Sequence, residues 1–93
     1  MIRSFADTRT AALFLGKAAK GIPADVQRRA KRKLDLIHAA MTLDFLRSPP
    51  GNRLEALKGD RIGQHSIRVN DQWRLCFVWR DGDAHDVEFT DYH

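Results

Sequence analysis

The sequence predicts an α+β domain in which two N-terminal helices pack on one face of a small antiparallel β-sheet. Three observations support this fold class. Residues 24–41 carry apolar side chains at helical spacing, residues 65–69 and 72–79 alternate between apolar and polar side chains, and residues 81–83 (DGD) are a hairpin turn signal. Helices that come first and strands that follow as a three- or four-stranded meander favour separate layers, with the second face of the sheet left open.

The first helix is predicted over residues 8–20. Asp7 or Thr8 can cap its start, and Gly21 is suited to end it. Before it, residues 2–5 (IRSF) can form a short strand that completes the sheet. The apolar side of this helix contains Leu13, Phe14 and Ala18.

The second helix is the clearest element of the sequence. Pro23 suits its first turn, and Asp25 interacts favourably with the N-terminal end of the helix dipole. Its apolar stripe consists of Val26, Ala30, Leu34, Ile37 and Met41. The other face carries Arg28, Arg29, Lys31, Arg32 and Lys33. This basic run is either a solvated helix face or a surface that docks on RNA or on an acidic partner protein.

The strands follow a loop at residues 48–52 (SPPGN). Residues 65–69 form one strand, Asn70-Asp71 turns the chain into a second strand at residues 72–79, and the DGD turn leads into a last strand at residues 84–93. In these strands Ile67, Leu75 and Phe89 are among the residues that face the helices.

The same alternation sorts the polar residues of the strands. The side chains predicted on the open face, away from the helices, are Arg68, Arg74, Glu88 and Tyr92. Asp91 and His93 have the parity of the core, so they reach the open face only if the last strand twists or stops pairing near its end. The alternative is that the two arginines form cross-strand ion pairs with Glu88 and neighbouring acids, while Tyr92 covers the sheet edge and His93 is solvated.

Bulk properties fit one soluble domain over residues 1–93. A chain of 93 residues with 43% hydrophobic and 30% charged residues can bury a single modest core. No apolar run reaches the length of a membrane span, the first residues lack a signal-peptide core, and the lone Cys76 cannot form an internal disulfide. We therefore expect a cytoplasmic protein without membrane association.

Charge is distributed unevenly along the chain. All 16 Lys and Arg lie within residues 1–80 against seven acids, a balance of +9, whereas the last 13 residues hold five acids and no Lys or Arg. A basic body suits a polyanion such as nucleic acid, which binds through phosphate contacts and counterion release. The alternative is a solvated surface without a partner.

Other chemistries find little support. The four histidines show no paired metal-ligand spacing, and one cysteine cannot supply a zinc set. The chain has no glycine-rich phosphate loop, and its serines lack a nucleophile-elbow context. Cys76, in the middle of a strand, suits a packing role. We expect no metal and no cofactor.

Three pieces of sequence carry a family resemblance: LKGDR at residues 57–61, NDQWR at residues 70–74 and DYH at residues 91–93. With the opening MIRSF and with GIPADVQRR at residues 21–29, nearly the whole chain resembles the HigB toxins of bacterial HigBA-type toxin–antitoxin modules. These toxins are plasmid maintenance system killer proteins of the RelE superfamily.

The resemblance implies a compact RelE-like fold and a metal-independent endoribonuclease, an mRNA interferase that cleaves messages as they are translated in the A site of the 70S ribosome. It also implies a HigA-type helix-turn-helix antitoxin as partner. Carried over by position, the residues implied for catalysis are Arg74, Tyr92, His93, Asp91, Lys58 and Arg68. Some relatives have histidine where Glu55 stands, so an accessory acid–base role falls to Glu55 or to another residue.

Elementary chemistry agrees with these residue types. RNA supplies its own nucleophile, the 2′-OH, so cleavage needs a base, cations for the phosphorane and an acid for the leaving oxygen. Lys58, Arg68 and Arg74 suit the second task, and each well-aimed donor supplies roughly 3–4 kcal/mol. Histidine is the side chain whose ordinary pKa lies nearest neutrality, so His93 is the first choice for proton transfer. Tyr92 can stack on a base or orient the 2′-OH, and Asp91 can orient its neighbours.

Two other functions are compatible with the sequence. One is a non-catalytic basic module that binds RNA or the ribosome and blocks translation sterically, leaving messages intact. The other is a ribonuclease that cuts naked RNA without the ribosome. A site with few acid–base groups argues for a substrate that the ribosome preorganises.

Overall fold

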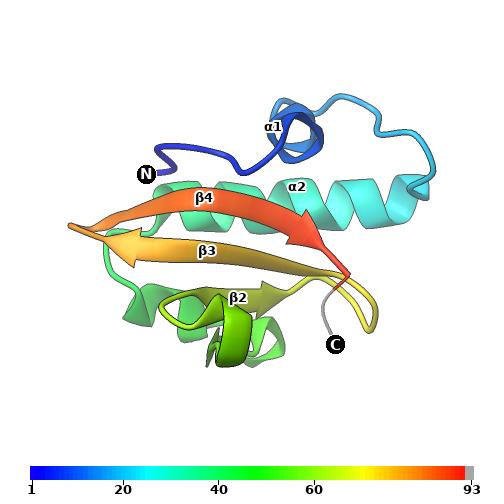
Figure 1. Ribbon diagram of the computed structural model, residues 1–93. Helices are drawn as coiled ribbons and strands as arrows, with labels where there is room; N and C mark the ends of the chain where they lie inside the picture. Colours follow the sequence, from blue (N-terminus) through cyan, green and yellow to red (C-terminus); the bar gives the residue numbers. More distant parts are fainter. Residues whose placement is uncertain (92–93) are drawn as a thin grey trace.

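The structure, a computed structural model, describes residues 1–91 (Figure 1). Within them, α1 (Thr8–Phe14) and α2 (Ala24–Ala39) precede four strands. The strands are β1 (Glu55–Ala56), β2 (His65–Arg68), β3 (Arg74–Arg80) and β4 (Asp83–Thr90). Short 3₁₀ segments lie between α2 and β2, namely η1 (Asp44–Arg47), η2 (Pro50–Asn52) and η3 (Gly59–Arg61). The predicted α+β class is confirmed.

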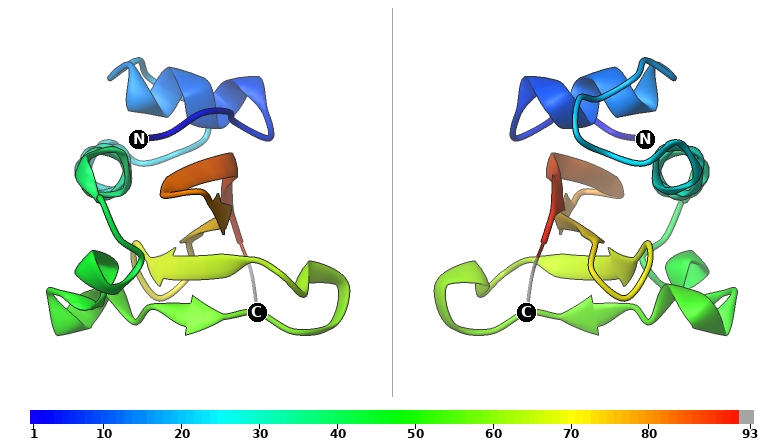
Figure 2. Two further views of the ribbon diagram at one scale, coloured as in Figure 1. Left: turned by 90° about the vertical axis from the view of Figure 1, so that its left-hand side faces the viewer. Right: turned by 90° about the vertical axis from the view of Figure 1, so that its right-hand side faces the viewer.

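All four strands form one antiparallel sheet in the order β1-β2-β3-β4. Figure 2 shows α1 at the β4 edge of this sheet and β1 at the opposite edge. Along the outer edge of β4, Ile2 and Phe5 make isolated parallel bridges to Ala84 and Val87. The N-terminal segment therefore extends the sheet by two bridges, where the sequence suggested a first strand.

The β3–β4 hairpin has the predicted turn. Asp81 and Gly82 have φ angles of 54° and 79°, the left-handed pair that a two-residue hairpin turn requires. Further along β4, Asp86 also has a positive φ of 54°, and the pairing register shifts between Cys76 and Val78. This bulge keeps Val87 on the core side of the sheet, where it is buried.

The core lies between the helices and the sheet. The stripe of α2 is buried as predicted at Val26, Ala30, Leu34 and Ile37, and Phe77 and Phe89 are the largest fully buried side chains of the sheet. Met41, however, is 86% exposed. Its predicted place in the stripe is wrong because α2 ends at Ala39 and Ala40 takes an extended conformation.

The first helix begins as predicted but ends early. Asp7 caps it, and its carboxylate accepts a hydrogen bond of 2.7 Å from the Thr10 amide. The helix ends at Phe14, near Gly16 with φ 77°, and the Lys17 amide returns to the Ala12 carbonyl at 2.9 Å. An end at Gly21 was therefore wrong, and Ala18, expected on the apolar side, is exposed.

No helix within residues 1–91 is both long and apolar enough to span a bilayer.

Candidate active site and basic surface

Cross-strand pairs define the open face of the sheet. Because residues directly opposite each other share a face, one row joins Arg68, Arg74 and Thr90. A second row joins Glu55, Ser66, Cys76 and Glu88. The predicted placement of Arg74 and Glu88 on this face is confirmed. The face is not bare, since Ser66 and Cys76 are fully buried beneath longer side chains.

Arg74, the first residue of β3, lies between β2 and β4 on this face and is held firmly. Its Nε donates to Ser66 Oγ at 2.8 Å, and its Nη2 donates to the Arg53 carbonyl at 2.8 Å. The same Nη2 lies 3.9 Å from Glu55 Oε1, at the limit of an ion pair. The side chain is only 14% exposed. These contacts fix one edge of the guanidinium, and its remaining N–H donors can meet a phosphate.

Glu55 and Lys58 come from β1 and from the residues that follow it. The Glu55 side chain is 55% exposed next to Arg74, so its carboxylate is open to solvent. Lys58 is exposed at the start of η3, and within residues 1–91 its side chain makes no hydrogen bond or ion pair. Among the described residues Lys58 is therefore an exposed cation without a side-chain partner, in contrast to the hydrogen-bonded Arg74.

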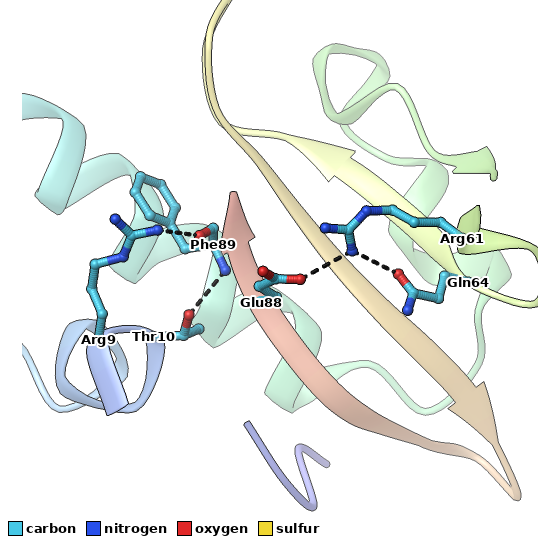
Figure 3. Close-up of polar contacts among 6 residues, drawn as sticks. All are labelled: Arg9, Thr10, Arg61, Gln64, Glu88 and Phe89. Atoms are coloured by element: carbon cyan, nitrogen blue, oxygen red, sulfur yellow. Dashed lines mark hydrogen bonds and ion pairs between the residues drawn. The ribbon is translucent and has the colours of Figure 1, made fainter. Parts of the chain in front are cut away.

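Glu88 is paired with Arg61. Arg61 Nη1 donates to Glu88 Oε1 at 3.0 Å and to Gln64 Oε1 at 3.1 Å (Figure 3). One interpretation of the sequence made Glu88 a partner of Arg68 or Arg74, and its ion pair is instead with Arg61. Next to this pair, burial raises the pKa of the Cys76 thiol, which agrees with a packing role for that residue.

Arg68 starts opposite Arg74 but its guanidinium goes elsewhere. It pairs with Asp71, three residues further along the chain. It also lines a groove of about 530 Å³ between α2, η2 and the end of β2, together with Arg29, Arg32 and Lys33. Arg68 and Arg74 share a face by register, yet their guanidinium groups have different neighbours. That of Arg68 lies near Asp71 and the groove, and that of Arg74 contacts Ser66 and the Arg53 carbonyl.

The basic residues of α2 differ in their exposure to solvent. Arg28, Arg29 and Arg32 are exposed. Lys31 is half-buried, with Nζ 2.6 Å from Asp35 and 5.0 Å from the centre of the Phe14 ring. The five residues of this basic run are therefore not equally exposed to solvent.

Lys33 is the second half-buried residue of that run. Its Nζ donates to Asn52 Oδ1, and Asn52 in turn donates to the Leu46 and Ser48 carbonyls at 3.2 and 3.1 Å. Burial lowers the pKa of Lys33, and the nearby positive charges of Arg32, Arg29 and Arg68 lower it further. This concentration of like charge makes the groove a favourable place for an anion.

The end of β4 carries the remaining predicted residues. Asp91 is exposed, directly after β4, and its Oδ2 accepts a hydrogen bond of 3.2 Å from Gln72 Nε2. Its neighbour Thr90 lies directly opposite Arg74. Tyr92 and His93, predicted for stacking and proton transfer, lie outside the described residues.

Sequence reasoning missed three groups that shape the site. Ser66 and the Arg53 carbonyl position Arg74, and Arg61 adds a second guanidinium on the open face. Ser66 lies two residues before Arg68 in the alternating run 65–69 and therefore shares the face of Arg68, so this spacing was a usable signal. The Arg53 carbonyl depends on a left-handed residue, with φ 46°, that no local pattern indicated.

Metal ligands do not gather in the part of the chain that the structure describes: no group of three or more His, Cys, Asp or Glu is placed to hold an ion there.

Comparison with known proteins identifies the family. The model of the RelE-like toxin of type II toxin–antitoxin system HigB matches residues 3–93. Toxin HigB-1 of Vibrio cholerae serotype O1 is 49% identical over 63 residues, which are 68% of this chain and 66% of that protein. Endoribonuclease HigB of Proteus vulgaris is 36% identical over 93 residues and covers 100% of both chains.

Solved structures share the fold at low sequence identity. A chain of the YoeB-YefM complex from Staphylococcus aureus has a TM-score of 0.61 at 16% identity, covering 100% of this chain and 98% of that chain. A YafQ mutant from E. coli has a TM-score of 0.62 at 13% identity, covering 98% and 93%. With the family match over residues 3–93, these findings show that the chain belongs to the HigB family of RelE-like toxins of type II toxin–antitoxin systems.

Proposed function

We propose that the chain is the toxin of such a system and acts in the cytoplasm as a ribosome-dependent mRNA endoribonuclease. The observation that carries the proposal is the Arg74 guanidinium, fixed on the open face by Ser66 and the Arg53 carbonyl and still able to donate. A preorganised cation of this kind suits the charge that develops on a phosphorane. The name of the full-length Proteus vulgaris relative supports endoribonuclease chemistry.

In the proposed reaction, the RNA 2′-OH attacks the adjacent phosphate. Arg74 stabilises the negative charge of the phosphorane, and Lys58 adds a second positive charge at the same phosphate. The 2′ proton passes to a base, and the 5′ oxygen receives a proton as it leaves. His93 is our assignment for proton transfer because imidazole titrates near neutrality. Glu55, exposed beside Arg74, is the accessory acid–base group.

The remaining predicted residues are assigned to substrate placement. Tyr92 stacks on or orients the nucleotide at the cleaved bond, and Asp91 orients its neighbours. Arg68 contacts RNA from the edge of the groove, beside the reaction centre, since its guanidinium already faces the cations of α2. The exposed Arg28, Arg29 and Arg32 supply affinity for ribosomal RNA or mRNA phosphates.

Type II toxins are held inactive by an antitoxin, and we propose that the partner of this chain is a HigA-type helix-turn-helix protein. A frame for such a protein next to the toxin gene would support this partner. Purification of the toxin with the product of that frame would test it, and a failure of the two proteins to associate would contradict it.

The decisive experiment is induced expression followed by 5′-end mapping of a translated message. We expect cuts within codons that disappear when the start codon of that message is removed. Arg74→Ala serves as the inactive control. Intact messages combined with arrested translation would instead support the steric RNA-binding module, and cuts in purified naked RNA would contradict ribosome dependence.

A further inference from the structure

The outer edge of β4 is covered in two different ways along its length. Near its start, the N-terminal segment supplies backbone partners: the Arg3 amide donates to the Ala84 carbonyl at 2.8 Å, and the Ala6 amide donates to the Val87 carbonyl at 2.9 Å. At Asp7 the chain turns into α1, so this pairing stops at Val87. The next residue with its backbone on that edge is Phe89.

At Phe89, two side chains of α1 supply the hydrogen-bond partners of the β4 backbone. The Phe89 amide donates to Thr10 Oγ1 at 2.9 Å, and Arg9 Nη2 donates to the Phe89 carbonyl at 2.8 Å (Figure 3). Thr10 is fully buried. Both backbone groups of Phe89 are therefore satisfied by side chains that stand where a neighbouring strand would otherwise pair.

Arg9 is also fixed by aromatic rings. The rings of Trp73 and Phe89 stack with centroids 4.4 Å apart, and the Arg9 guanidinium lies 5.4 Å from each centroid. Within residues 1–91 no carboxylate lies within ion-pair distance of Arg9. Its charge is directed at the Phe89 carbonyl and at two ring faces, a well-defined geometry for a residue at the surface.

Glu88, the residue before Phe89, is held from the opposite side of β4. Figure 3 shows Arg61 reaching Glu88 across the sheet, while Arg9 and Thr10 approach Phe89 from α1. Glu88 is therefore held from the β3 side of β4, and Phe89, the next residue, is held from the α1 side. The next residue, Thr90, lies opposite Arg74, and Asp91 follows.

We propose that Arg9 and Thr10 are positioning residues for the reaction: they fix the end of β4, and with it Thr90 and Asp91, relative to Arg74. The inference rests on the proposed function, in which Arg74 and Asp91 belong to one active site. Asp91 follows Phe89 by two residues, so a shift at Phe89 displaces Asp91 relative to Arg74. A misplacement of about 1 Å at a reacting group costs on the order of a hundredfold in rate.

The test uses matched variants of the full chain. Thr10→Val removes the hydroxyl that accepts from Phe89 and keeps the side-chain shape, whereas Thr10→Ser retains the hydroxyl. Thr8→Val makes the same change at an exposed position of α1. Arg9→Gln removes the guanidinium and Arg9→Lys keeps the charge. Arg3→Gln is the control arginine, because Arg3 Nε contacts Asp83 at the other end of β4, at 3.0 Å.

Two measurements are made on each variant. Hydrogen–deuterium exchange of the Phe89 and Asp91 amides reports the anchoring directly and does not depend on catalysis. Cleavage of ribosome-bound message gives kcat and KM. We expect exchange to rise and kcat to fall, each by about tenfold or more, in Thr10→Val and Arg9→Gln, with KM within about twofold. Thr10→Ser and Arg9→Lys recover most of kcat, and the two controls behave as the parent.

Each outcome decides a separate point. Parental exchange at Phe89 in Thr10→Val and Arg9→Gln overturns the anchoring. Raised exchange with parental kcat overturns the positioning role. A parent that cleaves nothing on the ribosome overturns the proposed function, while the exchange measurement still decides whether α1 anchors β4. If Thr10→Val unfolds, Arg9→Gln decides, because Arg9 is a surface residue whose loss leaves no cavity.

Discussion

Arg74 and the exposed arginines of α2 carry the same charge in contrasting surroundings. The Arg74 side chain is 14% exposed and is held by a hydroxyl and a carbonyl. Arg28, Arg29 and Arg32 project from a helix surface into solvent. A fixed guanidinium keeps its geometry through a reaction, whereas a solvated one adapts to whatever phosphate approaches.

This difference separates two contributions to activity. A cation that is already oriented stabilises the transition state more than the ground state, so its loss lowers kcat. A cation on a flexible surface binds substrate and transition state equally, so its loss raises KM. The following predictions test whether the two regions divide in this way.

The largest expected effect is that of Arg74→Ala. We expect growth inhibition to be abolished and kcat to fall by roughly 10²–10³-fold, because one preorganised donor is lost at the phosphorane. Arg74→Lys should recover little, since an ammonium cannot meet Ser66 and the Arg53 carbonyl with the same planar geometry. Plating after induction and single-turnover cleavage measure both effects. Undiminished toxicity of a folded Arg74→Ala protein would remove Arg74 from the site.

The second-largest effect on cleavage is expected from deletion of Tyr92 and His93. If these residues handle protons and the nucleotide, their loss lowers cleavage by about tenfold or more. The deletion removes none of the buried core side chains within residues 1–91, so the melting temperature should change little. Cleavage by the shortened chain is compared with that of the parent on the same message. A truncated protein that cuts at the parental rate would leave the chemistry to Arg74 and its neighbours.

A smaller effect is expected from the triple change of Arg28, Arg29 and Arg32 to Gln. We expect KM to rise severalfold with kcat nearly unchanged, and the slope of log affinity against log salt to fall by about one for each phosphate that is no longer neutralised. Arg80→Gln, at the other end of β3 from Arg74, is the control for charge alone. If the triple variant lost as much kcat as Arg74→Ala, the division into a region that sets kcat and a region that sets KM would be wrong. Lys31 and Lys33 are left unchanged because both support the fold.

The smallest effect concerns Asp83, at the start of β4. Hydrogen bonds from Arg3 and from the N-terminal ammonium lower the pKa of Asp83. Because the folded pKa lies below the unfolded value, the carboxylate stabilises the fold above the unfolded pKa and loses this effect as the pH falls through the folded pKa. Asp83→Asn should lower the melting temperature by about 1–3 °C at pH 7.

Thermal melting of Asp83→Asn and parent between pH 7 and pH 2 measures the effect, and the two curves should converge in acid. A difference that stayed constant down to pH 2 would contradict the ion pair as its cause. Parental activity at pH 7 is expected, since Asp83 lies at the opposite end of β4 from Thr90.

Much of this fold was accessible from the sequence because its signals are periodic. The stripe of α2, the alternation of β3 and the DGD turn each depend on spacing alone. All three were confirmed except for Met41, the last residue of the predicted stripe. The residues at which the helices end cannot be predicted from periodicity. Gly16 ended α1 by adopting a left-handed conformation, although Gly21 had the same residue type and a similar φ of 81°.

For the candidate site, the sequence predicted only which residues lie on the same face of the sheet. Parity placed Arg68 and Arg74 together, and the register agrees, but parity carries no information on rotamers. Arg68 turns to Asp71 because an acid lies three residues away, and Arg74 turns to a carbonyl presented by the left-handed Arg53. The roles given to Tyr92 and His93 stay predictions, since both residues lie outside those that the structure describes.

The bridges from Ile2 and Phe5 to β4 affect how the protein is made. Ile2 and Phe5 are translated long before their partners Ala84 and Val87. Until residues 83–90 emerge, the nascent chain has α1 and α2 without the strand that carries Val87 and Phe89, and Thr90 is not yet opposite Arg74. The order of synthesis thus delays assembly of the site, and a polypeptide abandoned before β4 leaves the cell without the arrangement proposed to cut its messages.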